Sequence, residues 1–158
     1  MRISIITATY NSKKNIRDCL QSVEKQSYEN IEHIIIDGGS TDNTLEFIKN
    51  SPSVSQWTSE PDDGIYDALN KGIRMATGDV IGFLHSDDML GSNDIIKQIA
   101  QTFQSDKSVD GVFGNLIFVD AGNTNKVVRT WHSKSFSYKN VRYGWMPPHP
   151  TLFLRKEV

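Results

Sequence analysis

The stretch GDVIGFLHSDDML, residues 78–90, places an apolar run directly before a pair of acidic side chains. The run 80–84 has the length and composition of a buried β-strand, and Gly78-Asp79 before it favours a turn. Asp87 and Asp88 follow the expected strand end, which is where ligands bind in open α/β sheets. Adjacent carboxylates repel each other unless a cation or several donors hold them. A hard divalent cation shared with a phosphorylated ligand fits the pair, and a solvated acidic turn is the alternative.

Composition describes one ordinary globular domain of 158 residues, 37% hydrophobic and 23% charged. The net charge of −2 and the lack of a Lys/Arg block give no nucleic-acid or membrane signature. The single cysteine, Cys19, excludes an internal disulfide and favours a reducing compartment. No apolar run approaches the roughly 18 residues that span a bilayer, and the first run is too short for a signal peptide. We therefore expect a cytoplasmic protein.

Apolar runs alternate with stretches of helical spacing along the chain. Strands are expected at residues 2–8, 31–36, 54–59, 80–84, 109–119, 126–131 and 151–154. The run 109–119 is long for one strand, and Gly114-Asn115 favours a bend or bulge within it. A helix is expected after each of the first four strands, and another is expected to begin at 155–158. The third helix should turn four residues inward: Ile65, Leu69, Ile73 and Ala76. This order predicts a three-layer α/β/α fold with a mostly parallel central sheet, as a single domain over residues 1–158.

Acidic side chains follow three of the expected strands, at the strand end or in the next turn: Asp37, the pair Asp62 and Asp63, and the pair Asp87 and Asp88. Parallel strands bring such ends to one edge, so we expect a polar pocket able to hold a nucleoside and a metal–diphosphate. Lys71 and Arg74 are three residues apart and share a helix face. They either face phosphate or belong to a solvated helix surface. For Asp37, a turn role in which it bonds its own backbone is the alternative.

Other phosphate-binding classes lack their motifs here. The chain has no GxxxxGK[ST] and no GxGxxG after its first strand. Sugar nucleotidyltransferases carry a glycine-rich loop at that position, where this chain reads TATYNS, residues 7–12. A phosphoacceptor receiver domain has paired acids after its first strand, whereas here the pair follows the fourth. A non-catalytic α/β binding module of another kind remains as the alternative to an enzyme.

Four segments together resemble the inverting family-2 glycosyltransferases of the GT-A fold: TATYNSKKNIRDCLQSV, IIIDGGSTDNT, DGIYDALNKGIRMATGDVIGFLHSDD and HPTLFLRKEV. The resemblance covers essentially the whole chain and is strongest to bacterial enzymes of capsule, exopolysaccharide or lipopolysaccharide assembly. It implies a hexosyltransferase (EC 2.4) that moves a sugar, with inversion, from a nucleotide-diphosphate sugar to an acceptor hydroxyl. A UDP-sugar donor is favoured. Residues of about 1–120 would form the donor-binding part, and about 121–158 would begin the acceptor side.

The resemblance also implies roles for individual residues. Thr7, Ala8 and Tyr10 would cradle the base, and Asp37 would read a ring N–H of the nucleotide. The wall of the ribose and diphosphate site would comprise Asp62, Asp63, Asn70, Lys71, Arg74, Ser86 and Asp87. Asp87 and Asp88 would hold Mn²⁺ or Mg²⁺, which neutralises charge developing on the departing nucleoside diphosphate.

The chain departs from the family pattern at two points. His85 stands where many members have an aspartate; it could ligate the metal, but we expect it to face the sugar or bond a phosphate, because Asp87 and Asp88 already supply hard ligands. Trp145 and His149 belong either to an acceptor-side loop or to a packed proline-rich turn. The general base is usually a carboxylate beyond the segment that HPTLFLRKEV resembles, so we expect it beyond Val158. This chain would then be a donor-binding fragment, catalytically incomplete by itself. The acceptor would be a saccharide or lipid-linked saccharide, and sequence beyond Val158 would attach the protein to the inner face of the membrane.

Overall fold

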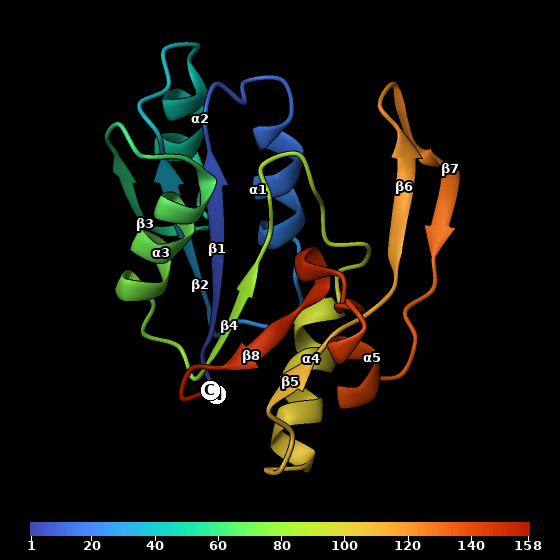
Figure 1. The fold of residues 1–158 in the computed structure, drawn as a ribbon. Coiled ribbons are helices and arrows are strands. Elements are labelled where there is room, and N and C mark those ends of the chain that lie inside the picture. Colours follow the sequence, from blue (N-terminus) through green and yellow to red (C-terminus); the bar gives the residue numbers. More distant parts are fainter.

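A computed structural model describes all residues, 1–158. Six strands form one sheet in the order β3-β2-β1-β4-β8-β5 (Figure 1). Its parallel strands, as predicted, are β1 (Ile3–Thr9), β2 (Ile31–Asp37), β3 (Val54–Ser59) and β4 (Val80–Phe83). β8 (Phe153–Arg155) runs antiparallel to both of its neighbours, β4 and β5 (Gly111–Val112).

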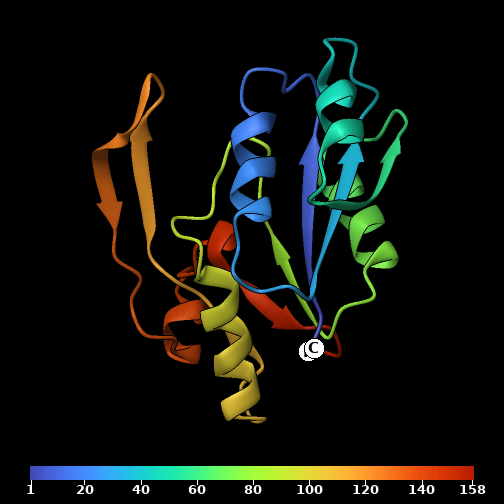
Figure 2. The ribbon, with the colours of Figure 1, turned by 180° about the vertical axis from the view of Figure 1, so that it is seen from behind.

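Helices cover both faces of this sheet and so give the three layers that the sequence predicts (Figure 2). The helix α3 (Ile65–Met75) lies on one face, and the other face carries α1 (Ile16–Glu24), α2 (Thr44–Asn50) and α4 (Ile95–Ser105). β1 contacts the helices on both faces of the sheet because its successive side chains point to opposite faces. Ile3 and Ile5 pack with Phe103 of α4, whereas Ile6 packs with Ala68 of α3.

The structure overturns half of the inward face predicted for α3, which comprised Ile65, Leu69, Ile73 and Ala76. Ile65 is 49% exposed and Ile73 is 38% exposed. The small residues Ala68 and Gly72 face the sheet instead, and a Cβ on Gly72 would lie 2.3 Å from Cγ2 of Ile6. The helix backbone therefore rests almost directly on β1, which leaves the two isoleucines outside the contact.

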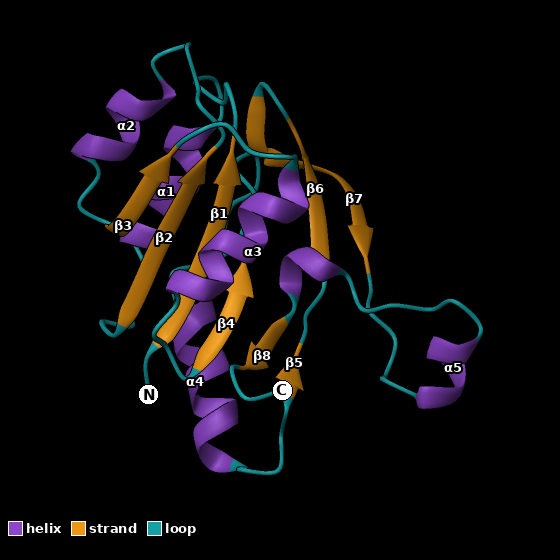
Figure 3. Cartoon of the chain, turned by 60° about the vertical axis from the view of Figure 1, so that its left-hand side comes forward, coloured by secondary structure: helices purple, strands orange, loops and turns teal.

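The long strand predicted at 109–119 is divided into two strands. β5 ends at Val112, and β6 (Leu116–Asp120) starts after the Gly114-Asn115 bend. β6 pairs antiparallel with β7 (Asn123–Trp131) in a separate two-stranded sheet. Figure 3 shows this ribbon beside the main sheet, with the short helix α5 (Tyr138–Arg142) further out.

The helix start predicted at 155–158 is wrong. After a 3₁₀ turn, η1 (His149–Thr151), Arg155 closes β8, and the chain then turns. The Arg155 guanidinium donates to the carbonyls of Val109 (2.8 Å) and Phe103 (3.0 Å). Lys156 donates from its backbone N–H to the Asp79 carbonyl at 3.0 Å. Pairing on both sides of β8 and these carbonyl contacts hold the segment extended.

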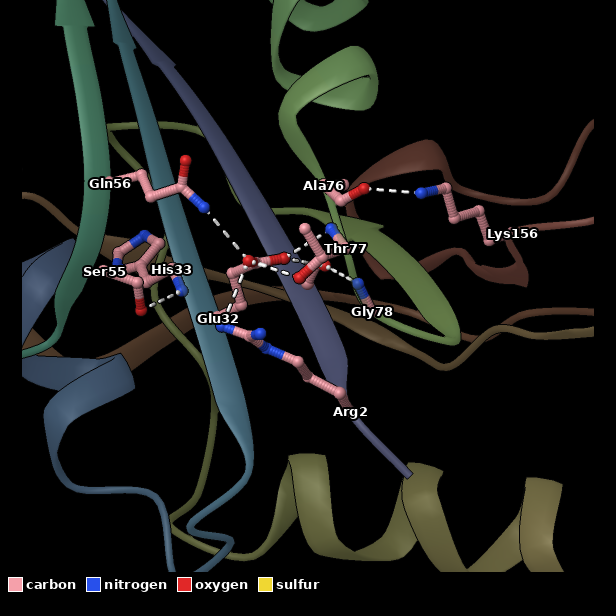
Figure 4. Close-up of polar contacts among 10 residues, drawn as sticks. Arg2, Glu32, His33, Ser55, Gln56, Ala76, Thr77, Gly78 and Lys156 are labelled. Atoms are coloured by element: carbon pink, nitrogen blue, oxygen red, sulfur yellow. Dashed lines mark hydrogen bonds and ion pairs between the residues drawn. The ribbon is translucent and has the colours of Figure 1, made fainter.

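A buried carboxylate ties the strands together near their N-terminal ends (Figure 4). Glu32 is completely buried and accepts hydrogen bonds from the Ser4 hydroxyl (2.6 Å), from the Thr77 N–H (2.7 Å) and from Gln56 (3.2 Å). The Arg2 guanidinium lies 3.1 Å away. Burial by itself would raise the pKa of Glu32, but the hydrogen bonds from Ser4 and Thr77 and the charge of Arg2 together lower it.

Candidate functional site

The C-terminal ends of β1, β2 and β4 lie along one edge of the sheet because these strands are parallel. Thr9 is in register with Asp37, and the N–H of Leu84 donates to the Ile6 carbonyl at 3.0 Å. The loops beyond these ends touch one another, since the hydroxyls of Ser12 and Ser86 lie 2.9 Å apart. The fold thus gathers the loops that carry the predicted acidic side chains at a single edge.

Asp37 lies beneath this edge and is completely buried. One carboxylate oxygen accepts from the N–H groups of Gly39 (3.1 Å) and Ser40 (2.9 Å) and from the Ser59 hydroxyl (2.7 Å). The other accepts from the Ser40 hydroxyl. The carboxylate therefore fixes the loop after β2 against the end of β3. Its predicted contact with a nucleotide base stays a prediction.

Tyr10, Gly38 and Asp62 form a corner of the same edge. One oxygen of Asp62 accepts the N–H of Gly64 at 2.9 Å, whereas its other oxygen, Oδ2, has no hydrogen-bond donor in the chain. A Cβ on Gly38 would lie 2.7 Å from that Oδ2 and 3.5 Å from the ring of Tyr10. The Asp62 carboxylate thus occupies the space that a side chain at position 38 would take, beside the 64%-exposed ring of Tyr10. Asp63 is exposed next to it.

The basic face of α3 is divided between a paired and an unpaired cation. The Lys71 ammonium contacts the carboxylates of Glu60 (2.9 Å) and Asp67 (3.1 Å), and these hydrogen bonds raise its pKa. Arg74 and Asn70 are exposed, and no carboxylate pairs with Arg74. Of the two cations predicted to face phosphate, the structure therefore leaves Arg74 free and engages Lys71 within the chain.

The acidic pair lies in a turn after β4, where the Asp88 N–H donates to the His85 carbonyl at 3.0 Å. Asp87 is exposed and Asp88 is half-buried. Burial and the charge of Asp87 raise the pKa of Asp88, and the nearby His85 and His149 oppose this only in part. η1 places His149 edge-to-face against His85, with ring centroids 5.3 Å apart. Two imidazoles thus stand beside a carboxylate pair that is not neutralised within the chain.

Two predicted residues lie away from the pocket. Thr7 is completely buried, and its hydroxyl hydrogen-bonds Nε2 of His33 at 3.0 Å inside the sheet. Ala8 is 8% exposed and packs under α3. Trp145 lies between α5 and η1, and its ring packs edge-to-face against Phe113 and Phe136, with ring centroids 6.0 and 6.2 Å apart.

A polar pocket of about 560 Å³ lies on the α1 side of the acidic pair, and most of its lining was not predicted from the sequence. It is lined by Asn11, Ser12, Lys13, Lys14, Asn15, Asp42, Ser86 and Asp87. The loop that supplies five of these residues is held by Asp42, which accepts the Lys13 N–H at 3.1 Å. Two lysines directly after the first strand were the available signal, because that strand end was already expected at the pocket.

Comparison with known proteins identifies the family of the chain. The model of glycosyl transferase family 2 matches residues 4–155. An uncharacterised glycosyltransferase of Haemophilus influenzae is 36% identical over 98% of this chain and 62% of its own length. One from Mycobacterium tuberculosis is 38% identical over 71% of this chain and 44% of its own. The chain thus spans about half the length of these curated relatives.

Solved structures show the same fold. Staphylococcus aureus TarS (residues 1–349) matches 99% of this chain and 47% of its own with a TM-score of 0.74 and 22% identity. Its complex with UDP matches 72% of this chain and 35% of its own, with a TM-score of 0.65 and 28% identity. A mannosyltransferase of Pyrobaculum calidifontis, in complex with GDP-Man and Mn²⁺, matches the same shares with a TM-score of 0.65 and 25% identity. The fold is GT-A, and the chain belongs to glycosyl transferase family 2.

Proposed function

We propose that this chain is the donor-binding part of a glycosyltransferase that takes a sugar from a nucleotide-diphosphate sugar. The observation that carries the proposal is the meeting of the unneutralised Asp87–Asp88 pair and the open Asp62 corner at one sheet edge. Support comes from the TarS complex with UDP and the mannosyltransferase complex with GDP-Man and Mn²⁺. A UDP-sugar is the favoured donor.

In place of the base contact predicted for Asp37, we propose that Asp62 reads the base and that Asp37 acts through the loop. All four donors that reach Asp37 belong to the chain, and its carboxylate is completely buried. Asp62 Oδ2 has no donor, so it can accept the ring N–H of a base that lies against Tyr10. Arg74, Asn70 and Ser86 would line the ribose and diphosphate.

A divalent cation fits the acidic pair. No three His, Cys, Asp or Glu side chains form a complete metal site, but Asp87 and Asp88 offer hard oxygen ligands whose mutual repulsion a cation relieves. Mn²⁺ or Mg²⁺ bound there would stabilise negative charge on the leaving diphosphate. Asp87 and Asp88 would hold the cation, and the turn from His85 would orient them.

The remaining features of the reaction extend the proposal. Transfer would be a single displacement with inversion onto an acceptor hydroxyl in cell-surface polysaccharide synthesis, and a carboxylate beyond Val158 would act as general base. His85, Trp145 and His149 would face a saccharide or lipid-linked saccharide acceptor. The protein would work in the cytoplasm. No helix in the structure is long and apolar enough to cross a bilayer.

Calorimetric titration with UDP, with and without Mn²⁺, tests the metal site. We expect Mn²⁺ to tighten UDP binding, and Asp87→Asn or Asp88→Asn to weaken it roughly tenfold or more by removing a charged ligand. Asp110→Asn, an exposed carboxylate elsewhere, is the matched control. UDP binding that does not depend on the metal, or wild-type affinity for UDP in both variants, would contradict the proposed metal site.

A second titration tests the base contact. Because a hydrogen bond to a charged group contributes about 1.5–3 kcal/mol, Asp62→Asn should weaken UDP binding by roughly tenfold or more. Binding of inorganic diphosphate with Mn²⁺ should not change. Equal losses for both ligands would place Asp62 at the phosphates. Donor hydrolysis by this chain, measured beside a longer form of the protein, separates an enzyme from a non-catalytic binding module.

A further inference from the structure

Large apolar side chains are exposed mainly in one short part of the chain. Of the 18 large hydrophobic residues that are exposed, ten lie between residues 117 and 146. They are Ile117, Phe118, Val127, Val128, Trp131, Phe136, Tyr138, Val141, Tyr143 and Met146. Scattered exposed apolar residues are normal, but a concentration of this kind marks an interaction surface. We name residues 116–146 the ribbon segment.

Both faces of the β6–β7 ribbon are exposed to solvent. Its strands pair only with each other, and every residue of β7 is exposed. One face carries Phe118 and Trp131, with the Arg129 guanidinium 5.3 and 5.9 Å from their ring centroids. Ile117 and Val128 lie on the other. An isolated two-stranded ribbon is only marginally stable in water, so this one calls for a covering partner.

The ribbon segment also differs from the rest of the chain in charge. It contains five lysines and arginines but one acidic residue, Asp120, in a protein whose net charge is −2. The basic residues are Lys126, Arg129, Lys134, Lys139 and Arg142, and all are exposed. The segment therefore carries +4, and the remainder of the chain is acidic.

We propose that the ribbon segment binds the surface of an anionic lipid membrane. Proteins that bind membrane surfaces carry aromatic side chains next to lysine and arginine. The aromatic rings insert at the level of the lipid headgroups, and the cations contact the lipid phosphates. Aliphatic residues such as Ile117 and Val128 gain nothing from a nucleic-acid backbone but gain from burial among acyl chains. Two copies of a +4 segment repel each other, which disfavours a second chain as the cover. The ribbon segment includes Trp145, which we propose to face the acceptor, but membrane binding by its exposed residues goes beyond the proposed function and does not depend on the donor site.

Sedimentation with lipid vesicles tests this surface. We expect the chain to bind vesicles of phosphatidylcholine with about one-third phosphatidylglycerol, and to be released by high salt. Since each basic residue near an anionic surface contributes about 1 kcal/mol, Lys139→Glu with Arg142→Glu should lower vesicle affinity roughly tenfold or more. The matched control is Lys97→Glu with Lys107→Glu, which changes the net charge equally on exposed sites around α4.

A second variant tests the apolar contribution. Tyr138→Ser with Tyr143→Ser should weaken binding to the same vesicles while leaving circular dichroism unchanged, because both rings are more than 80% exposed. The proposal is overturned by absent vesicle binding or by equal losses in the charge-reversal variant and its control. Binding to a single-stranded oligonucleotide in preference to vesicles, or a stable dimer in ultracentrifugation without vesicle binding, also overturns it.

Discussion

At the scale of the residue, the number of donors already bound to a carboxylate decides what it can still do. Asp37 accepts four hydrogen bonds from its own chain and is completely buried. Asp62 accepts one and leaves an oxygen open beside Tyr10. Both follow strands at the same sheet edge, so strand position alone does not separate them. The two carboxylates differ because Gly39, Ser40 and Ser59, the last distant in sequence, supply donors to Asp37.

The charge of Glu32 is expected to stabilise the fold, because its carboxylate is completely buried and paired with several donors. Glu32→Gln would turn an amide NH₂ toward donors from Ser4 and Thr77, and the Arg2 cation would lose its partner. We expect a loss of about 2–4 kcal/mol in the free energy of unfolding at pH 7. Urea denaturation measures it, with Glu29→Gln, an exposed neighbour before β2, as the control.

The same variant makes a prediction about pH. The pKa of Glu32 is lowered in the folded state, so its stabilisation is present above its unfolded pKa of about 4.3 and is lost as pH falls through the folded value. The stability difference between wild type and Glu32→Gln should therefore shrink when denaturation is repeated below pH 4. A difference that stays constant down to pH 3 contradicts the assignment.

At the scale of the element, local patterns predicted the strands and helices, and long-range contacts decided the rest. The apolar runs around Ile5, Ile35 and Ile81 needed no partner to be recognised as strands. The face of α3 was mistaken at Ile65 and Ile73 because hydrophobicity does not report how closely a helix approaches a sheet. Likewise, the edge that gathers the acidic loops was predictable from strand order. The pairing of Lys71 with Glu60 was not, since it depends on where β3 ends.

The close approach of α3 to β1 gives an element-scale prediction. Alanine normally stabilises a helix interior by about 1 kcal/mol over glycine. Gly72→Ala should instead destabilise the protein by about 1–2 kcal/mol, because its Cβ would lie 2.3 Å from Cγ2 of the stiff, buried Ile6. Thermal unfolding measures the effect, and Gly91→Ala, with open space around its Cβ, is the control. If Gly72→Ala is equally harmful in an Ile6→Ala background, the contact is not the cause.

At the scale of the whole molecule, hydrogen bonds hold the first and last residues of the chain together, near the buried carboxylate of Glu32. Asp79 donates its N–H to the Arg2 carbonyl at 2.8 Å and accepts the Lys156 N–H on its own carbonyl at 3.0 Å. The polar edge lies beyond the opposite ends of the same strands. The N-terminal ends of the parallel strands therefore carry the contacts that stabilise the fold, and their C-terminal ends carry the loops that are open to a ligand.

The reactivity of Cys19 can be used to monitor unfolding of the whole domain. Cys19 is completely buried, and burial raises the pKa of its thiol to about 12 against a weaker opposing hydrogen bond from Thr7. The charges of Asp88 and Asp87 add smaller increases in this pKa. We expect no reaction with a disulfide reagent at pH 8 in the folded protein, and one equivalent of labelling in denaturant. Across a urea titration, labelling should follow the loss of circular dichroism. Fast labelling without denaturant would show that α1 opens locally.

The antiparallel strand β8 also sets the order in which this sheet can form. Residues 153–155 lie between β4 and β5, so the two residues of β5 have no partner in this sheet until residues 153–155 have been synthesised. During translation β1 to β4 can pair as they emerge, while the edge of β4 stays exposed. Closing that edge joins residues far apart in sequence, which is a slow step. A nascent chain stalled before residue 153 therefore presents an open β-edge to chaperones or to other nascent chains.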